Sequence, residues 1–304
     1  MSLFDRRVLL VTGKGGVGKS TVSAALALEA VRRGKRVLLA EVGGATRMPE
    51  LFAVQGQGYA VSQLTPGLHT LSITSAAAIE DYIVQQVRVR AIYKLVFRNR
   101  IMGPFMDAVP GLHDLVQLGK VFDLERERRR GRPTWDLIVV DAPATGHGLT
   151  MLSAPASMME LTVAGPFHEN ARVVHELFVD PARTGIVLVT LPEEMPVNET
   201  VDLYQRLGAY QPQVLACVLN EIHEDPFAPL DAWETARPFL DRPALREAVG
   251  YTDRAVRRAR QQDEARSRLR DGLPVSLTEL PYLYRRDLTP GALSELGQRF
   301  AEAG

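Results

Sequence analysis

Short apolar runs recur along the chain, and several of them are apolar throughout rather than alternating with polar positions. A strand buried on both faces of a sheet needs apolar side chains on both sides, whereas a half-exposed strand alternates. The runs therefore predict the strands of a mostly parallel sheet. They comprise residues 8–12, 36–41, 69–73, 136–141, 185–191, 214–219 and 275–280.

Helical patterns lie between most of these strands, at residues 20–33, 197–207 and 290–301. Strands that alternate with helices predict a doubly wound α/β fold, with helices on both faces of the sheet. Because the strand signals run through nearly the whole chain, we expect one domain over residues 1–304. A further predicted helix over residues 243–270 has few apolar positions, so it is either solvated or faces a partner.

Two helical insertions interrupt this pattern, at about residues 75–132 and 151–180. They are predicted to form a helical subdomain that either moves or serves as a fixed cap, and the sequence does not separate these alternatives. Methionines in the insertions either line a groove for a hydrophobic segment or pack in an ordinary core. These methionines are Met102, Met106, Met151, Met158 and Met159.

Composition excludes several classes of protein. In a chain of 304 residues that is 46% hydrophobic and 24% charged, a large core can form. The 36 basic and 36 acidic residues balance, so no overall field favours nucleic acid or an anionic membrane. A single cysteine, Cys217, excludes disulfides within the chain and suits a reducing, cytoplasmic location. No apolar stretch approaches the length of a membrane span.

The first strand is followed by a phosphate-binding motif that opens directly into a helix. Glycines let the main chain wrap around phosphate oxygens, and the helix N-terminus favours negative charge. Lys19 is expected to contact the β- and γ-phosphates, Ser20 to bind Mg²⁺ and Thr21 to contact the α-phosphate. The motif consists of Gly13, Lys14, Gly15, Gly16, Val17, Gly18, Lys19, Ser20 and Thr21.

A second candidate site is the apolar strand that ends at Asp141 and the loop DAPATGHGL that follows it. A carboxylate at this position can hold Mg²⁺ through water opposite Ser20, or it can simply cap the next turn. His147 in the same loop either senses the γ-phosphate or stabilises the loop by a hydrogen bond.

The motifs GKGGVGKST and DAPATGHGL, together with PGLHDL at Pro110, resemble the ArsA family of anion-transporting ATPases. The resemblance covers nearly the whole chain and implies a Mg²⁺-dependent ATPase with ATP as its nucleotide. In that family the extra lysine of the loop touches nucleotide across a dimer interface. Lys14 is thereby expected to act in a homodimer or in a heterodimer with a paralogous ATPase; the alternative is a surface lysine in solvent.

The resemblance also implies residues near the nucleotide base. The segments LVTLPEE and CVLNEIH place a carboxylate at Glu193 and an adenine-reading amide at Asn220, which favours ATP over GTP. The segment ELPYLYRRDL resembles the family's adenine-covering loop and nominates Pro281 and Tyr282. Surface packing is the alternative for these last two residues.

The chain also departs from the family pattern. An ungapped match puts Gly43 where the family has the aspartate that positions the attacking water. Glu41, two residues earlier, is our candidate to replace that aspartate. With one cysteine, the chain lacks the clusters needed for arsenite pumping, for a zinc clasp or for an iron–sulfur cluster.

The sequence therefore predicts a cytoplasmic dimeric ATPase with Lys14, Lys19, Glu41 and Asp141 in catalysis. Its nucleotide state would control binding of a protein or membrane-associated client, with peripheral membrane association left open. An ATP-binding regulatory subunit without useful turnover is the main alternative. A small-molecule kinase and a chromosome-partitioning protein are two further alternatives, and neutral net charge disfavours the latter.

Overall fold

The computed structural model describes residues 2–44, 46–86, 109, 111–143, 148–224, 230–240 and 242–302. Within these residues a single large sheet has the order β10-β9-β8-β1-β7-β2-β4-β3, and all neighbours are parallel except β3 and β4. Its strands are β1 (Val8–Gly13), β2 (Val37–Val42), β3 (Ser62–Thr65), β4 (Leu68–Ile73), β7 (Leu137–Asp141), β8 (Thr184–Thr190), β9 (Val214–Ile222) and β10 (Ser276–Pro281).

The central strands are buried on both faces, as their continuous apolar runs predict. In β1, Leu9 and Val11 belong to one core cluster, whereas Val8 and Leu10 belong to the other. Successive side chains of a strand point to opposite faces, so one strand contributes to two cores. The predicted doubly wound, mostly parallel α/β fold is confirmed.

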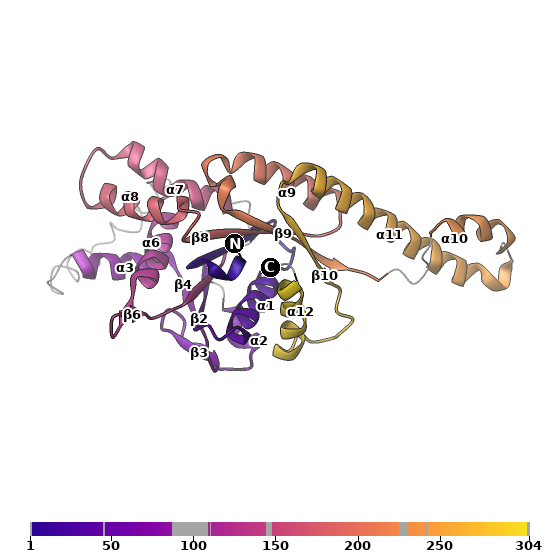
Figure 1. The fold of residues 1–304 in the computed structure, drawn as a ribbon, viewed down its shortest axis with the longest axis horizontal. Helices are drawn as coiled ribbons and strands as arrows, with labels where there is room; N and C mark the ends of the chain where they lie inside the picture. Colours follow the sequence, from indigo (N-terminus) through magenta and orange to yellow (C-terminus); the bar gives the residue numbers. More distant parts are fainter. Residues whose placement is uncertain are drawn as a thin grey trace.

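Helices cover both faces of the sheet (Figure 1). One face packs against α1 (Lys19–Arg32), α2 (Arg47–Leu51) and α12 (Pro290–Glu302), and α1 and α12 lie side by side. The opposite face packs against α9 (Glu194–Arg206), the end of α11 (Arg246–Gly272) and a layer of further helices. That layer contains α3 (Ser75–Gln86), α6 (Leu112–Arg126), α7 (Gly148–Leu161) and α8 (Pro166–Val179).

The helical layer comes from the two predicted insertions, whose helices pack against one another and on the sheet. Met151 and Met158 of α7 are buried in the core, and Met159 is partly buried against it. These three methionines therefore pack as ordinary core residues. Met102 and Met106 lie outside the described residues.

Two short elements were not anticipated from the sequence. The edge strand β3 alternates buried and exposed positions, and it pairs antiparallel with β4 at the end of the sheet. The basic run after α6 forms a ribbon of β5 (Arg128–Arg129) and β6 (Arg132–Pro133), with Arg130 and Gly131 at positive φ in the turn. The helix ends at Arg126, and the ribbon follows it directly.

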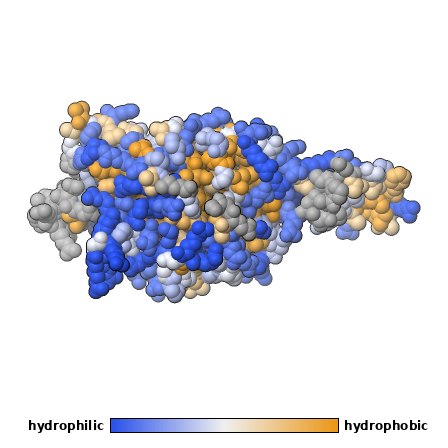
Figure 2. All heavy atoms as spheres, in the orientation of Figure 1, coloured by the Kyte–Doolittle hydropathy of each residue, from blue (hydrophilic) through white to orange (hydrophobic). Residues whose placement is uncertain are grey.

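The long helix α11 extends away from the body as an arm, with α10 (Leu230–Ala236) near its far half (Figure 1). The side chains of Trp233 and Arg237 both donate hydrogen bonds to Asp253, which ties the two segments together. Figure 2 shows apolar residues gathered at the end of this arm. Phe239, in the short helical turn Arg237–Leu240 that follows α10, is 77% exposed. Among the described residues, no helix is both long and apolar enough to cross a membrane.

Candidate active site

The predicted site residues gather along one edge of the sheet, where the parallel strands end. The motif follows β1, Asp141 ends β7, Glu41 lies near the end of β2, and Asn220 lies near the end of β9. The carboxyl edge of an open parallel sheet is where such folds bind ligands, because loops from neighbouring strands meet there. The topology thus brings together segments that are more than 200 residues apart.

The loop between β1 and α1 is held in a conformation that requires glycine at two positions. Gly13 has a φ of +153°, and a Cβ atom built there would lie 2.2 Å from the carbonyl oxygen of Val189. Gly18 has a φ of +86°, and a Cβ atom there would lie 2.3 Å from the side-chain nitrogen of Asn220. A side chain at either residue would be strained and would also collide with a neighbour.

Lys19 is buried at the mouth of this loop. Its Nζ atom donates a hydrogen bond to the carbonyl oxygen of Lys14 at 2.8 Å. Burial lowers the pKa of Lys19, while the nearby charge of Asp141 acts in the opposite direction. An ammonium group held in this way is desolvated in advance and directed at the loop that would surround phosphate.

Asp141 and Ser20 converge from β7 and α1. The Ser20 hydroxyl donates to Asp141 Oδ2 at 2.6 Å, and the Ser23 hydroxyl donates to Oδ1 at 3.2 Å. Burial raises the pKa of Asp141, whereas these two hydrogen bonds and the charge of Lys19 lower it. A hydroxyl and a carboxylate brought together offer the hard oxygen ligands that Mg²⁺ prefers, so the residues present fit that ion.

A pocket of about 330 Å³ opens in front of these groups. Five residues of the predicted phosphate-binding motif line it. It is also lined by Arg47, a cation that sequence reasoning missed. No motif identifies Arg47, because it lies beyond a glycine turn in the segment where the family pattern is broken. The lining residues are Gly16, Gly18, Lys19, Ser20, Thr21, Val42, Gly43, Arg47, Asp141, Ala142 and Pro143.

Glu41 lies beside this pocket but is not part of its lining. Its side chain is buried, and Oε1 accepts hydrogen bonds from the main-chain N–H groups of Arg47 at 2.7 Å and Met48 at 3.2 Å. Burial raises the pKa of Glu41 to about 7, helped by the negative charge of its register partner Asp141 and opposed by the two N–H groups. The carboxylate thus caps the start of α2.

Gly43 lines the pocket at the position where the family pattern has an aspartate. It has a φ of +91°, and a Cβ atom there would lie 3.1 Å from Cβ of Pro143. The turn between β2 and α2 is therefore built around glycine rather than around a carboxylate. The predicted role of Glu41 in place of that aspartate stays a prediction.

Lys14 does not extend freely into solvent. Its Nζ atom lies 2.6 Å from Oε1 of Glu199, which is on α9. The two side chains are 36% and 44% exposed, so solvent screens this ion pair. The pair holds the side chain of Lys14 against α9 of the same chain.

The residues predicted near the base lie at the ends of β8, β9 and β10. Asn220 is buried, and its side-chain N–H donates to the carbonyl oxygen of Val17 at 3.0 Å, so this amide also supports the phosphate loop. Glu193 is exposed and precedes α9. The neighbouring Glu221 has a φ of +60°, and burial raises its pKa with a further contribution from the charge of Glu193.

Pro281 and Tyr282 continue from β10, and the main-chain N–H of Tyr282 donates to the carbonyl oxygen of Ile222 at 2.8 Å. The ring of Tyr282 stacks on His223, with ring centroids 4.6 Å apart. Tyr284 contacts both rings and accepts or donates a hydrogen bond with His223 at 2.7 Å. Sequence reasoning missed His223, whose partners are about 60 residues away in the chain.

The loop that carries Thr145 and His147 lies outside the described residues, so the predictions for it stay predictions. Gly15, Val17 and Thr21 occupy the loop and helix start as the motif requires, and Val17 is buried. The metal and nucleotide roles of all these residues also stay predictions.

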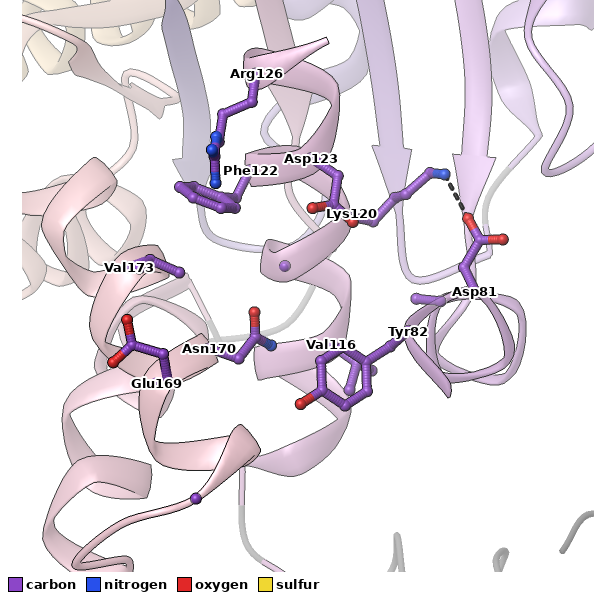
Figure 3. Close-up of a pocket in the computed structure, with 13 residues that line it drawn as sticks. Asp81, Tyr82, Val116, Lys120, Phe122, Asp123, Arg126, Glu169, Asn170 and Val173 are labelled. Carbon is purple, nitrogen blue, oxygen red and sulfur yellow. Dashed lines mark hydrogen bonds and ion pairs between the residues drawn. The ribbon is translucent and has the colours of Figure 1, made fainter. Parts of the chain in front are cut away.

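A larger cavity of about 460 Å³ lies in the helical layer, among α3, α6 and α8 (Figure 3). Lys120 pairs with Asp81 at 2.5 Å on one side of it, and the guanidinium of Arg126 lies over the ring of Phe122. None of the residues predicted for the nucleotide site lines this cavity.

Comparison with known proteins identifies the family pattern independently. The family model described as anion-transporting ATPase matches residues 6–163 and 161–236. The chain is 29% identical to the ATPase BagA of Mycobacterium tuberculosis, over 98% of this chain and 93% of that protein. It is 26% identical to the arsenical pump-driving ATPase of Escherichia coli, over 66% of this chain and 37% of that protein.

Proposed function

The chain belongs to the anion-transporting ATPase family, and we propose that it is a Mg²⁺-dependent ATPase whose nucleotide state switches a dimer. The observation that carries this proposal is the convergence of Lys19, Ser20 and Asp141 on one pocket at the carboxyl edge of the sheet. Three different chemical groups needed for phosphoryl transfer meet there.

Catalysis in such a site is mainly a matter of position and charge. The main-chain N–H groups of the loop and the N-terminus of α1 surround the phosphates, and Lys19 adds a positive charge. Its contact with the carbonyl oxygen of Lys14 keeps the Nζ atom at the loop. Little side-chain reorganisation is then required when nucleotide binds.

Ser20 and Asp141 are the residues that would hold Mg²⁺, Ser20 directly and Asp141 through water. The ion would neutralise charge on the β- and γ-phosphate oxygens. The hydrogen bond from Ser23 to the other carboxylate oxygen of Asp141 fixes the direction of that side chain. Second-sphere contacts of this kind orient metal ligands in general.

Glu193, Asn220, Pro281 and Tyr282 are proposed to contact the ribose and base of ATP. The supporting observation is that Asn220, Pro281 and Tyr282 come from adjacent strand ends beside the phosphate loop. The side-chain N–H of Asn220 donates to the carbonyl oxygen of Val17. The side-chain oxygen of Asn220 can accept a hydrogen bond from the exocyclic amine of adenine.

Lys14 is proposed to reach nucleotide across the interface of a homodimer or of a heterodimer with a paralogous ATPase. Its side chain is 36% exposed, and among the described residues it pairs with Glu199 in an ion pair that solvent screens. Release from Glu199 would leave the side chain free to cross a subunit boundary.

We further propose that residues 1–304 act as one unit in the cytoplasm, with the helical insertions at about 75–132 and 151–180 coupled to nucleotide. α3 follows β4 directly, and α7 follows the loop after Asp141. A movement of the loops at the edge of the sheet would therefore displace the ends of these helices. The client would be a protein or a membrane-associated molecule that this layer contacts.

A regulatory subunit that binds ATP without useful turnover is the second candidate function. It is favoured by Gly43, which gives the pocket no carboxylate at that position, and by Glu41, whose carboxylate is engaged with the amides of α2. In that case a partner subunit would supply turnover.

Single-turnover phosphate release, with protein in excess over ATP and with Mg²⁺ present, tests the two candidates. We expect release by the unaltered protein and loss of release in Lys19→Ala and Asp141→Asn. Asp263→Asn is the matched control, because the side chain of Asp263 is 65% exposed on α11, away from the pocket. Its release should equal that of the unaltered protein.

Bound ATP without release by the unaltered protein would favour the regulatory subunit. Unchanged release in both Lys19→Ala and Asp141→Asn would overturn the assignment of the active site. Nucleotide binding is measured in parallel, so that loss of binding is distinguished from loss of turnover.

A further inference from the structure

Arg47 is a second cation in the phosphate pocket that neither the motif nor the family pattern assigns. It is the first residue of α2 and lines the pocket together with Lys19, Ser20 and Asp141. Its side chain is exposed, and within the described part of the chain its guanidinium forms no hydrogen bond or ion pair. An arginine that lines a pocket together with Lys19 offers positive charge to an anionic ligand.

The main chain of Arg47 is fixed, although its side chain is exposed. Its N–H donates to Oε1 of Glu41 at 2.7 Å, and the N–H of the next residue, Met48, donates to the same oxygen. Met48 is fully buried in the core against the sheet. The Cα atom of Arg47 is therefore held at the rim of the pocket, and only the side chain is free to adjust to a ligand.

The residues that line the pocket come from three segments of the chain. One is the loop with the start of α1, the second runs from the end of β2 to Arg47 at the start of α2, and the third begins at Asp141 at the end of β7. By the geometry of this motif, the main chain of the first segment surrounds the α- and β-phosphates, and Lys19 reaches the β- and γ-phosphates. The second segment, which follows a different strand, can add a further contact to the terminal phosphate, which distinguishes ATP from ADP.

A guanidinium suits that task. Its planar set of N–H donors matches two phosphate oxygens at once, which a single ammonium group does not. Lys19, which one hydrogen bond to the carbonyl oxygen of Lys14 holds at the loop, supplies such an ammonium group. Arg47 can then add a contact that depends on the terminal phosphate.

We propose that Arg47 contacts the terminal phosphate of ATP bound to its own subunit and thereby strengthens the binding of ATP relative to ADP. Glu41 is then a positioning residue, because it holds the main chain of Arg47 rather than touching nucleotide. This inference rests on the proposed function and adds to it a specificity-determining residue.

The test compares the affinities for ADP and for the non-hydrolysable analogue β,γ-imido-ATP, measured by calorimetry with Mg²⁺. Arg47→Ala should lose about 10- to 100-fold in affinity for the analogue, the range expected for a charge-assisted hydrogen bond, and little for ADP. Arg47→Lys should lose less affinity for the analogue than Arg47→Ala does. Arg129→Ala, on the exposed ribbon, is the matched control and should bind both nucleotides as the unaltered protein does.

Glu41 variants separate positioning from contact. Glu41→Gln keeps an oxygen that accepts from both N–H groups and should retain the preference for the triphosphate. Glu41→Ala removes the acceptor and should reduce that preference while leaving the affinity for ADP unchanged. Thermal unfolding of each variant identifies any that fail to fold.

Equal affinities of Arg47→Ala and the unaltered protein for the analogue would overturn the role of Arg47 and leave the proposed function intact. Failure of the unaltered protein to bind either nucleotide would instead overturn the proposed function itself. Loss of affinity for both nucleotides in a folded Arg47→Ala variant would contradict the assignment to the terminal phosphate.

Discussion

The Nζ atom of Lys14, in the phosphate loop, lies 2.6 Å from Oε1 of Glu199, near the middle of α9. The lysine that the family pattern assigns to a neighbouring subunit is paired with a carboxylate of its own chain. Because both side chains are partly exposed, the pair contributes about 0.2–1 kcal/mol, and a competing phosphate can displace it. If Lys14 binds phosphate as proposed, Glu199 would compete with that phosphate only weakly.

Glu199→Ala should favour the ATP-dependent dimer, if Lys14 acts across the interface as proposed. The dimerisation constant should increase about two- to five-fold, because an ion pair that solvent screens contributes at most about 1 kcal/mol. Sedimentation with Mg²⁺ and β,γ-imido-ATP measures it. Asp202→Asn, on the exposed surface of the same helix, is the control and should leave the dimerisation constant unchanged.

Gly18→Ala should abolish nucleotide binding and destabilise the fold by about 1–3 kcal/mol, since φ at this residue is +86°. The added methyl group would also meet the side-chain nitrogen of Asn220, at 2.3 Å. Urea unfolding and calorimetry measure the two effects. Gly34→Ala is a useful comparison, because Gly34 has a φ of +81° but no atom within 4 Å of an added Cβ. A Gly18→Ala protein that binds ATP normally would contradict the described loop.

The stability of the nucleotide-free protein should fall as the pH rises from about 5 to about 8. The pKa of Glu41 in the folded state is about 7, above its ordinary value of 4.5, so the folded protein keeps a proton that the unfolded chain has released. Rising pH removes this advantage, which is at most about 3 kcal/mol.

Glu41→Gln carries no such proton and should lack this part of the pH dependence. Its free energy of unfolding relative to the unaltered protein should therefore increase between pH 5 and pH 8. Urea unfolding at several pH values gives the comparison. Glu264→Gln, at an exposed position on α11, serves as the control. Parallel curves for Glu41→Gln and the unaltered protein would refute the assignment of the titrating group.

Cys217 should not react with thiol reagents in the native protein. It is the only cysteine, its side chain is 1% exposed, and burial raises its pKa to about 12. The thiolate needed for reaction is therefore scarce and inaccessible. Labelling at pH 8 should be complete in urea and slow without it, and rapid stoichiometric labelling of the folded protein would show that β9 is exposed.

Much of the architecture could be predicted from the chain alone. The central strands are continuous apolar runs, and such runs indicate burial on both faces wherever they occur. The phosphate loop is equally local, since its glycines, Lys19 and Ser20 form one short segment between a strand and a helix. The sequence also predicts Asp141 opposite Ser20, on the two sides of a Mg²⁺ ion. The structure joins these two side chains by a hydrogen bond, and the metal role stays a prediction.

Other features depend on which strands are neighbours, and the tertiary structure alone decided them. Sheet order places β2 beside β7, so Glu41 and Asp141 become register partners although they are 100 residues apart. The same folding brings Arg47 to the pocket, Glu199 to Lys14 and Asn220 to the phosphate loop. A local pattern determines whether a segment is a strand, a loop or a helix. Contacts between distant side chains depend on the packing of the whole sheet, and no spacing in the sequence encodes them.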